Sequence, residues 1–292
     1  MLIPAIVLFA AFMAAPIIYT IYLSFLKSHV VGLGLGPNAK QEVFAGFSNY
    51  VSALTDPDLL AGAVRILIYG VILVPVMLGL ALLFALILDS RRSRARGFSR
   101  IAIFLPFAVP GIIASLIWGF LYLPGTSPFY SITKAMGLNV PSILEGNSVI
   151  FAIANIGIWG GVGFNMVVMY TALRSIPTEL YEAARLDGAS EVQISLRIKV
   201  PIIVPSLILT AIFSLISTLQ LFNEPNTLRP LTNSISTTFT PMMKVYRDAF
   251  IRNDFYTAAA TSIVIAIVIF ALSWGVLQVI QRRAFAGEGE AR

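Results

Sequence analysis

Small hydroxyl side chains recur along one apolar stretch of the chain, Pro201–Phe222. Their spacing places them on one face of a helix. These residues are Ser206, Thr210, Ser214, Ser217 and Thr218. Hydroxyls on such a face could hydrogen-bond a hydroxyl-bearing solute, or they could serve the close packing of helices in lipid. Both interpretations stay open, and the solute interpretation makes Ser214, Ser217 and Thr218 candidate pathway residues.

Amide and indole side chains supply a second set of candidates. Asn155 and Trp159 are four residues apart in another apolar stretch, so they share a helical face. An amide can bond a hydroxyl, and an indole can cover the face of a sugar ring. Gln220 and Asn223 add two more amides near the end of the hydroxyl-bearing stretch. The pair Gly157 and Gly161 is instead typical of a close helix crossing.

Several kinds of chemistry are missing from the sequence. The chain has no cysteine and one histidine, and no G-x-x-x-x-G-K-[ST] loop that would cradle a nucleotide phosphate. We therefore expect no metal site, no cofactor bound by this chain and no enzymatic activity. A membrane enzyme would have to use loop acids such as Glu224, Asp248 or Asp254.

The composition predicts the elements that position these residues. Of the 292 residues, 58% are hydrophobic and 12% are charged, about half the charge of a soluble protein. Six stretches are long enough to cross a bilayer and contain no charged residue. They are Met1–Leu26, Ile66–Leu88, Ile101–Leu123, Ser148–Leu173, Pro201–Phe222 and Phe255–Gln281. Because lipid cannot satisfy free backbone groups, each must be helical. The expected fold is an all-α polytopic membrane protein with six transmembrane helices in one domain, residues 1–292.

Basic residues predict the orientation of these spans. Arginines crowd the connection between the second and third spans, and further basic residues follow the fourth span and end the chain. They include Arg91, Arg92, Arg94, Arg96, Arg100, Arg174, Arg185, Arg197, Lys199, Arg282, Arg283 and Arg292. Loops rich in Lys and Arg stay in the cytoplasm, which predicts that both termini are cytoplasmic. This retention explains the cluster without a nucleic-acid partner, and we expect none.

The cytoplasmic connection after the fourth span has a distinct local pattern. Pro177 suits a first helical position, and Thr178–Leu186 contains good helix formers. Asp187–Gly188 should end this helix, because glycine adopts the left-handed conformation of a C-terminal cap. Ser190 and Gln193 fit a capping box that opens a second helix. This helical pair could insert into a groove of a partner, or it could simply join two spans.

The same connection, residues 174–200, resembles a known family. Glu182-Ala183-Ala184, Asp187-Gly188-Ala189, Ile198 and Pro201 are similar to the EAA loop of the membrane subunits of bacterial ABC importers. Pro201 is expected to mark the start of the fifth span. The sequence Asp254–Ala259 resembles the start of the last span in the carbohydrate branch of this family. The resemblance implies the type I ABC importer permease fold in the bacterial plasma membrane.

The resemblance also implies a mechanism and a set of partners. The loop would dock on a separate ATP-hydrolysing subunit, through Glu182, Ala183, Ala184, Asp187, Gly188 and Ala189. Two such subunits would bind ATP and Mg²⁺, while a second permease chain would complete the pore. An extracytoplasmic binding protein would deliver a sugar or sugar-like solute.

An alternative is an ion-coupled carrier that acts without an ATPase. The six spans contain no acidic residue for an ion, although backbone carbonyls can bind sodium.

Overall fold

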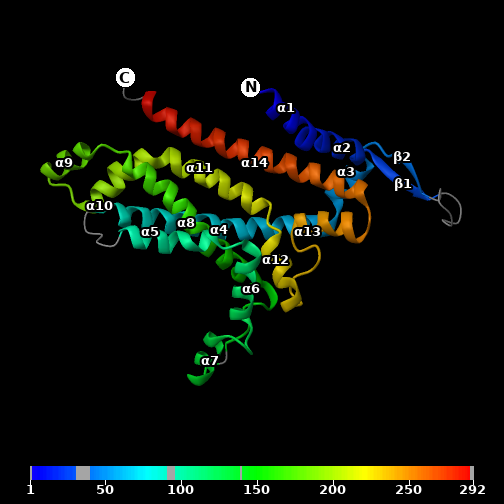
Figure 1. Ribbon diagram of the computed structural model, residues 1–292, viewed down its shortest axis with the longest axis horizontal. Helices are drawn as coiled ribbons and strands as arrows, with labels where there is room; N and C mark the ends of the chain where they lie inside the picture. Colours follow the sequence, from blue (N-terminus) through cyan, green and yellow to red (C-terminus); the bar gives the residue numbers. More distant parts are fainter. Residues whose placement is uncertain (1, 31–39, 91–95, 139, 290–292) are drawn as a thin grey trace. The chain divides into compact units, whose positions relative to one another are not determined.

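The computed structural model describes residues 2–30, 40–90, 96–138 and 140–289 (Figure 1). Arg91, Arg92, Arg94 and Arg292 of the basic clusters lie outside these residues. The described chain forms two compact units. One unit contains the part up to Ile66 together with Ser236–Leu272, and the other contains Leu67–Ile235 and the part from Ser273 onward. The single transmembrane domain over residues 1–292 stays a prediction.

Long apolar helices dominate both units. Five helical segments of the described residues are long and apolar enough to cross a membrane, and there are six if one bent pair counts as a span. The five are Ile3–Ser24, Pro57–Asp89, Gly146–Arg174, Glu191–Leu219 and Phe255–Gln278. This arrangement confirms the predicted all-α membrane fold.

The first unit combines apolar helices with a small hairpin. Strand β1 pairs with β2 in antiparallel register, Leu26 opposite Phe44 and His29 opposite Gln41. The hairpin was not predicted from the sequence. The following elements lie in this unit or begin in it: α1 (Ile3–Phe9), η1 (Ala10–Ala14), α2 (Ala15–Ser24), β1 (Leu26–Val30), β2 (Lys40–Phe44), α3 (Ser48–Thr55), α4 (Pro57–Asp89), α13 (Pro241–Tyr246), η6 (Arg247–Ile251) and α14 (Phe255–Gly289).

A buried cation in α13 links the start of α4 to η6 in the first unit. The Nζ atom of Lys244 lies 3.1 Å from Asp56 and 2.5 Å from Asp248. Asp56 also caps α4, because its carboxylate accepts hydrogen bonds from the backbone N–H groups of Asp58 and Leu59. Burial alone would raise the pKa of Asp56, but Lys244 and these amides lower it below its ordinary value.

The second unit is built around α8, which carries more buried apolar residues than any other element described in this unit. Helices α5, α6 and α11 contact α8 (Figure 1). Besides the remainder of α4, the elements are α5 (Arg96–Phe104), η2 (Leu105–Ala108), α6 (Gly111–Tyr122), α7 (Pro128–Ala135), η3 (Gly146–Ser148), α8 (Val149–Arg174), α9 (Thr178–Leu186), α10 (Glu191–Ile194), η4 (Ser195–Lys199), α11 (Val200–Leu219), α12 (Asn223–Leu228) and η5 (Arg229–Leu231).

Three glycines let other elements approach α8 closely. A Cβ atom on Gly157 would lie 2.4 Å from Leu73 Cδ1, and one on Gly161 would lie 2.3 Å from Met77 Sδ. Long side chains of α4 thus fill the space beside this glycine pair. The contact is made by these side chains and not by the close helix crossing that the sequence predicted for the pair. A Cβ atom on Gly163 would lie 2.4 Å from the backbone oxygen of Ile103 in α5. No larger residue fits there without displacing backbone.

The third predicted span, Ile101–Leu123, is not one straight helix. The segment Arg96–Ala108 and the helix Gly111–Tyr122 meet at an angle of 95° (Figure 1). Pro106 and Pro110 explain the break, because each lacks the N–H group that an uninterrupted helix would need. Pro110 instead serves as the extended N-cap of α6. Hydropathy detected the apolar length but not the bend.

The fifth span begins earlier than predicted. The helix runs without a break from Glu191 through α10, η4 and α11 to Leu219, so Pro201 lies inside it. Just before this proline, Ser195–Lys199 forms a π-helical turn, in which the N–H of Val200 donates to the carbonyl of Ser195. Pro201 has no N–H group to donate to the preceding turn, and the wider hydrogen-bond spacing of a π-helical turn lets the helix continue past it.

Candidate functional site

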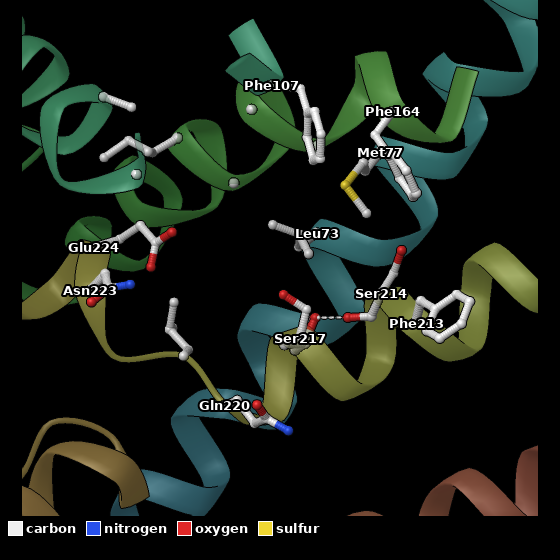
Figure 2. Close-up of a pocket in the computed structure, with 18 of the residues that line it drawn as sticks. Leu73, Met77, Phe107, Phe164, Phe213, Ser214, Ser217, Gln220, Asn223 and Glu224 are labelled. Atoms are coloured by element: carbon white, nitrogen blue, oxygen red, sulfur yellow. Dashed lines mark hydrogen bonds between the residues drawn. The ribbon is translucent and has the colours of Figure 1, made fainter. Parts of the chain in front are cut away.

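A cavity of about 620 Å³ opens inside the second unit (Figure 2). Its walls come from α4, from the bend between η2 and α6, from the glycine-rich face of α8, and from α11 and α12. Gly157, Gly160 and Gly161 of α8 form part of one wall. Sequence-distant segments therefore enclose one space.

Polar side chains gather on the α11–α12 side of the cavity. Five of the seven predicted pathway residues line it, namely Ser214, Ser217, Thr218, Gln220 and Asn223. Figure 2 shows Ser214, Ser217 and Gln220 on α11 and its end, with Asn223 on the segment that follows. The turn after α11 thus extends the hydroxyl face into a second polar group.

The hydroxyl stripe divides between the two interpretations of its role. Thr210 donates to the carbonyl of Leu207, and Thr218 donates to the carbonyl of Ser214. Both threonines are buried, and the methyl group of Thr218 lies against Gly70 of α4. Thr210 therefore serves packing alone, Thr218 packs against α4 at the edge of the cavity, and Ser214 and Ser217 face the cavity.

Asn155 and Trp159 lie in a different cluster. The Asn155 amide donates to the Tyr122 hydroxyl over 2.8 Å, and the Trp159 ring meets Trp118 edge-on at 6.0 Å. Neither of the two predicted residues lines the cavity. The structure therefore separates them from the other five pathway candidates.

The stacked rings of Phe107 and Phe164 lie across the cavity from the α11 hydroxyls (Figure 2). Phe107 and Phe164 are stacked with centroids 5.0 Å apart, and Tyr69 and Phe213 also line the space. Sequence reasoning missed all four residues. They come from α4, η2, α8 and α11, and no local spacing relates them.

Glu224 is the one carboxylic acid among the described residues that line the cavity. Figure 2 shows its carboxylate directed into the space from the start of α12. Burial raises the pKa of this carboxyl above its ordinary value, and a hydrogen bond with backbone opposes the shift. The sequence offered Glu224 only as a loop acid. No group of three or more His, Asp or Glu side chains suited to a metal ion occurs among the described residues.

The predicted docking loop has the local structure that its sequence indicates. Gly188 has φ +82°, and Ser190 and Gln193 form the reciprocal hydrogen bonds of a capping box. Pro177 is the N-cap of α9 rather than its first helical residue. Across the bend, Arg185 pairs with Glu191 at 2.8 Å.

The loop residues of the EAA pattern lie at its surface. Glu182, Ala183, Asp187 and Gly188 are exposed, and Ala184 and Ala189 are half-buried. Apolar side chains accompany them, since Leu186 is 90% exposed and Val192 is 67% exposed.

A buried ion pair fixes the base of the loop to α4. The Nζ atom of Lys199 lies 2.5 Å from the carboxylate of Asp89, and the two side chains are 5% and 4% exposed. The same Nζ lies 4.7 Å from the ring centroid of Tyr181 in α9. Burial and the negative charge of Asp89 raise the pKa of Tyr181 to about 12. The loop is thereby held against the end of a long apolar helix.

The fold and the site together define a polytopic membrane protein with a partly polar cavity among its helices. Residues 77–285 match the family described as the inner membrane component of binding-protein-dependent transport systems. The match covers more than half of the chain, so this protein belongs to that family. It is a permease of an ABC importer, located in the inner membrane and dependent on a binding protein.

Relatives and solved structures agree with this assignment. The chain is 26% identical over 288 residues to the sn-glycerol-3-phosphate transport system permease protein of Agrobacterium fabrum, which covers 97% of this chain and 94% of the relative. It is 29% identical over 262 residues to the diacetylchitobiose uptake system permease protein of Streptomyces coelicolor, covering 85% and 74%. The fold is similar to a chain of a bacterial alginate ABC transporter solved with its alginate-bound periplasmic protein, with a TM-score of 0.83, 21% identity, and coverage of 97% and 93%.

Proposed function

We propose that this permease imports a sugar or sugar-like solute through the cavity of its second unit. The observation that carries the proposal is the composition of the walls, with hydroxyls and amides on one side and stacked aromatic rings on the other. Hydroxyl and amide groups can hydrogen-bond sugar hydroxyls, and aromatic faces can cover the apolar face of a sugar ring. The uptake of diacetylchitobiose by a relative supports this solute class.

The solute path would use the polar side of this cavity. Ser214, Ser217, Gln220 and Asn223 present hydrogen-bonding groups to it, and Thr218 supports them from within α11. Asn155 and Trp159 would contribute only from their separate cluster with Trp118 and Tyr122. One chain supplies half of the pore, and a second, homologous permease chain would supply the other half.

Energy would enter through the EAA loop. Glu182, Ala183, Ala184, Asp187, Gly188 and Ala189 would dock in a cleft of a separate ATP-binding subunit. Two such subunits would hold the ATP and Mg²⁺, so this chain needs neither a nucleotide site nor a cofactor. ATP can switch the pore only through its different affinity for two states. The ion pair between Asp89 and Lys199 would carry the movement of the loop to α4.

A charge reversal at Glu182 tests the coupling role. In the transporter reconstituted with its ATPase subunits and binding protein, we expect Glu182→Lys to abolish the ATP hydrolysis that solute stimulates. The expected reason is loss of a polar contact in the partner's cleft. Stimulation is measured as the ratio of hydrolysis rates with and without solute-loaded binding protein.

Glu179→Lys is the matched control for this experiment. Glu179 is exposed, belongs to the same helix α9 and undergoes the same change of charge, but it lies outside the EAA pattern. It should retain most of the stimulation. Normal stimulation in Glu182→Lys, with the complex intact, would contradict the docking assignment.

A further inference from the structure

The cavity of the second unit has an unbalanced charge. Glu224 directs a carboxylate into it (Figure 2), and no arginine, lysine or histidine occurs among the described residues that line it. The ion pairs found within the described part of the chain do not include Glu224. The carboxylate therefore gives the cavity a negative potential.

The features of opposite sign next to Glu224 within the described walls are helix ends, the first turn of its own short helix α12 and the start of α6. Gly111 is the first residue of α6, and a Cβ atom placed on it would lie 3.8 Å from Glu224 Oε1. The N-terminal turn of a helix carries a partial positive charge, which favours the ionised carboxylate. It amounts to a fraction of a unit charge, so it cannot compensate a second anion in the same space.

The remaining walls recognise shape and hydroxyl groups rather than charge. Ser217, Gln220 and Asn223 offer neutral donors and acceptors, and the stacked rings of Phe107 and Phe164 offer apolar faces. A carboxylate among such groups is a strong acceptor for the hydroxyl groups of a sugar. The same carboxylate repels a phosphate or a second carboxylate.

We infer that the imported solute is an uncharged sugar or polyol, and that Glu224 is the specificity residue that excludes anions. This inference rests on the proposed function, because it requires the solute to pass through this cavity. It distinguishes the chain from its Agrobacterium relative, which is named for sn-glycerol 3-phosphate, an anion.

The lack of native cysteine allows a direct measurement of this potential. Ser217→Cys places one thiol in the cavity, and Thr126→Cys places one in the exposed turn after α6. In the reconstituted transporter, each thiol is labelled with a cationic and with an anionic methanethiosulfonate reagent of similar size. We expect the ratio of cationic to anionic rates to be about tenfold higher at Ser217→Cys than at Thr126→Cys.

Substitutions of Glu224 test whether this side chain causes the difference between the cationic and anionic labelling rates. In the Ser217→Cys background, Glu224→Gln should bring the ratio down to that of Thr126→Cys, and Glu224→Asp should largely preserve it. Because the same thiol reacts in both labellings, a change in its own reactivity cancels in the ratio. An equal ratio at both positions, or a ratio unaffected by Glu224→Gln, overturns the inference.

Protection by solutes separates this inference from the proposed function. Trehalose, diacetylchitobiose, glycerol and sn-glycerol 3-phosphate are each added with the binding protein and ATP. If one of the uncharged solutes slows the labelling of Ser217→Cys, the result supports the inference. If sn-glycerol 3-phosphate is the one solute that slows it, the inference is overturned. If any solute that the transporter takes up leaves the labelling rate unchanged, the solute path itself is wrong. If a sugar protects Ser217→Cys but the ratio of cationic to anionic labelling rates there equals that at Thr126→Cys, only the role of Glu224 is overturned.

Discussion

Gly188 occupies a backbone conformation that most residues adopt only at a cost. Its φ of +82° produces the turn between α9 and α10, and a Cβ atom there would have no neighbour within 4 Å. Any effect of substitution therefore arises from the backbone rather than from a steric clash with other residues. The requirement could be predicted from Asp187–Gly188 alone, because a helix C-cap is a local feature.

The predicted consequence is a graded loss of coupling at this residue. Gly188→Ala should destabilise the native turn by about 1 kcal/mol, because alanine disfavours positive φ. We expect weaker solute-stimulated ATP hydrolysis in the reconstituted complex, with normal assembly of the permease in the membrane. Gly188→Asn is the control, since asparagine tolerates this conformation better. Equal activity of the alanine and asparagine variants would show that the conformation does not matter for coupling.

Sequence patterns identified some residues of the candidate site and not others. Ser217 was predicted from the helical spacing of the hydroxyl residues, and Gln220 was predicted as an amide near the end of the same stretch. Glu224 was not predicted as a cavity residue, and neither were Phe107 and Phe164. Their proximity depends on how α8, α12 and the bend before α6 pack together, and a single sequence carries no local signal for that packing.

At the scale of elements, hydropathy predicted which stretches are apolar but not where each helix begins or bends. The length of Ile101–Leu123 fits one span, and only the 95° break divides it. The fifth helix starts at Glu191 because a π-helical turn bypasses Pro201. Prolines indicate a local disturbance, whereas the packing around them decides its size and direction.

The ion pair between α4 and the base of the docking loop gives a prediction at this scale. Lys199→Met would leave the Asp89 carboxylate buried without its cation, which should cost about 3–5 kcal/mol. We expect the single variant to unfold at a lower temperature in detergent, as measured by tryptophan fluorescence. The double variant Lys199→Met/Asp89→Leu should recover most of this loss, because it removes both charges. A single variant no less stable than the double variant would contradict the buried pairing.

At the scale of the whole molecule, the function depends on which membrane face presents the EAA loop. ATP is available in the cytoplasm, so a loop that docks on an ATPase has to lie on that side. Arg174, Arg185, Arg197 and Lys199 in and beside the loop favour cytoplasmic retention. The predicted third span, Ile101–Leu123, separates the arginine cluster from the turn that contains Thr126. This turn should therefore lie on the extracytoplasmic face of the membrane.

Single cysteines in the otherwise cysteine-free chain test this orientation. Ser175→Cys lies at the start of the loop and Thr126→Cys lies after α6, and both residues are exposed. In intact spheroplasts, a membrane-impermeant thiol reagent should label Thr126→Cys at once and Ser175→Cys only after permeabilisation. The reverse pattern would place the loop outside the cell, where no cytoplasmic ATPase could reach it. Because ATP-driven coupling and the basic residues both require the same face, that one result would exclude the proposed mechanism and the orientation together.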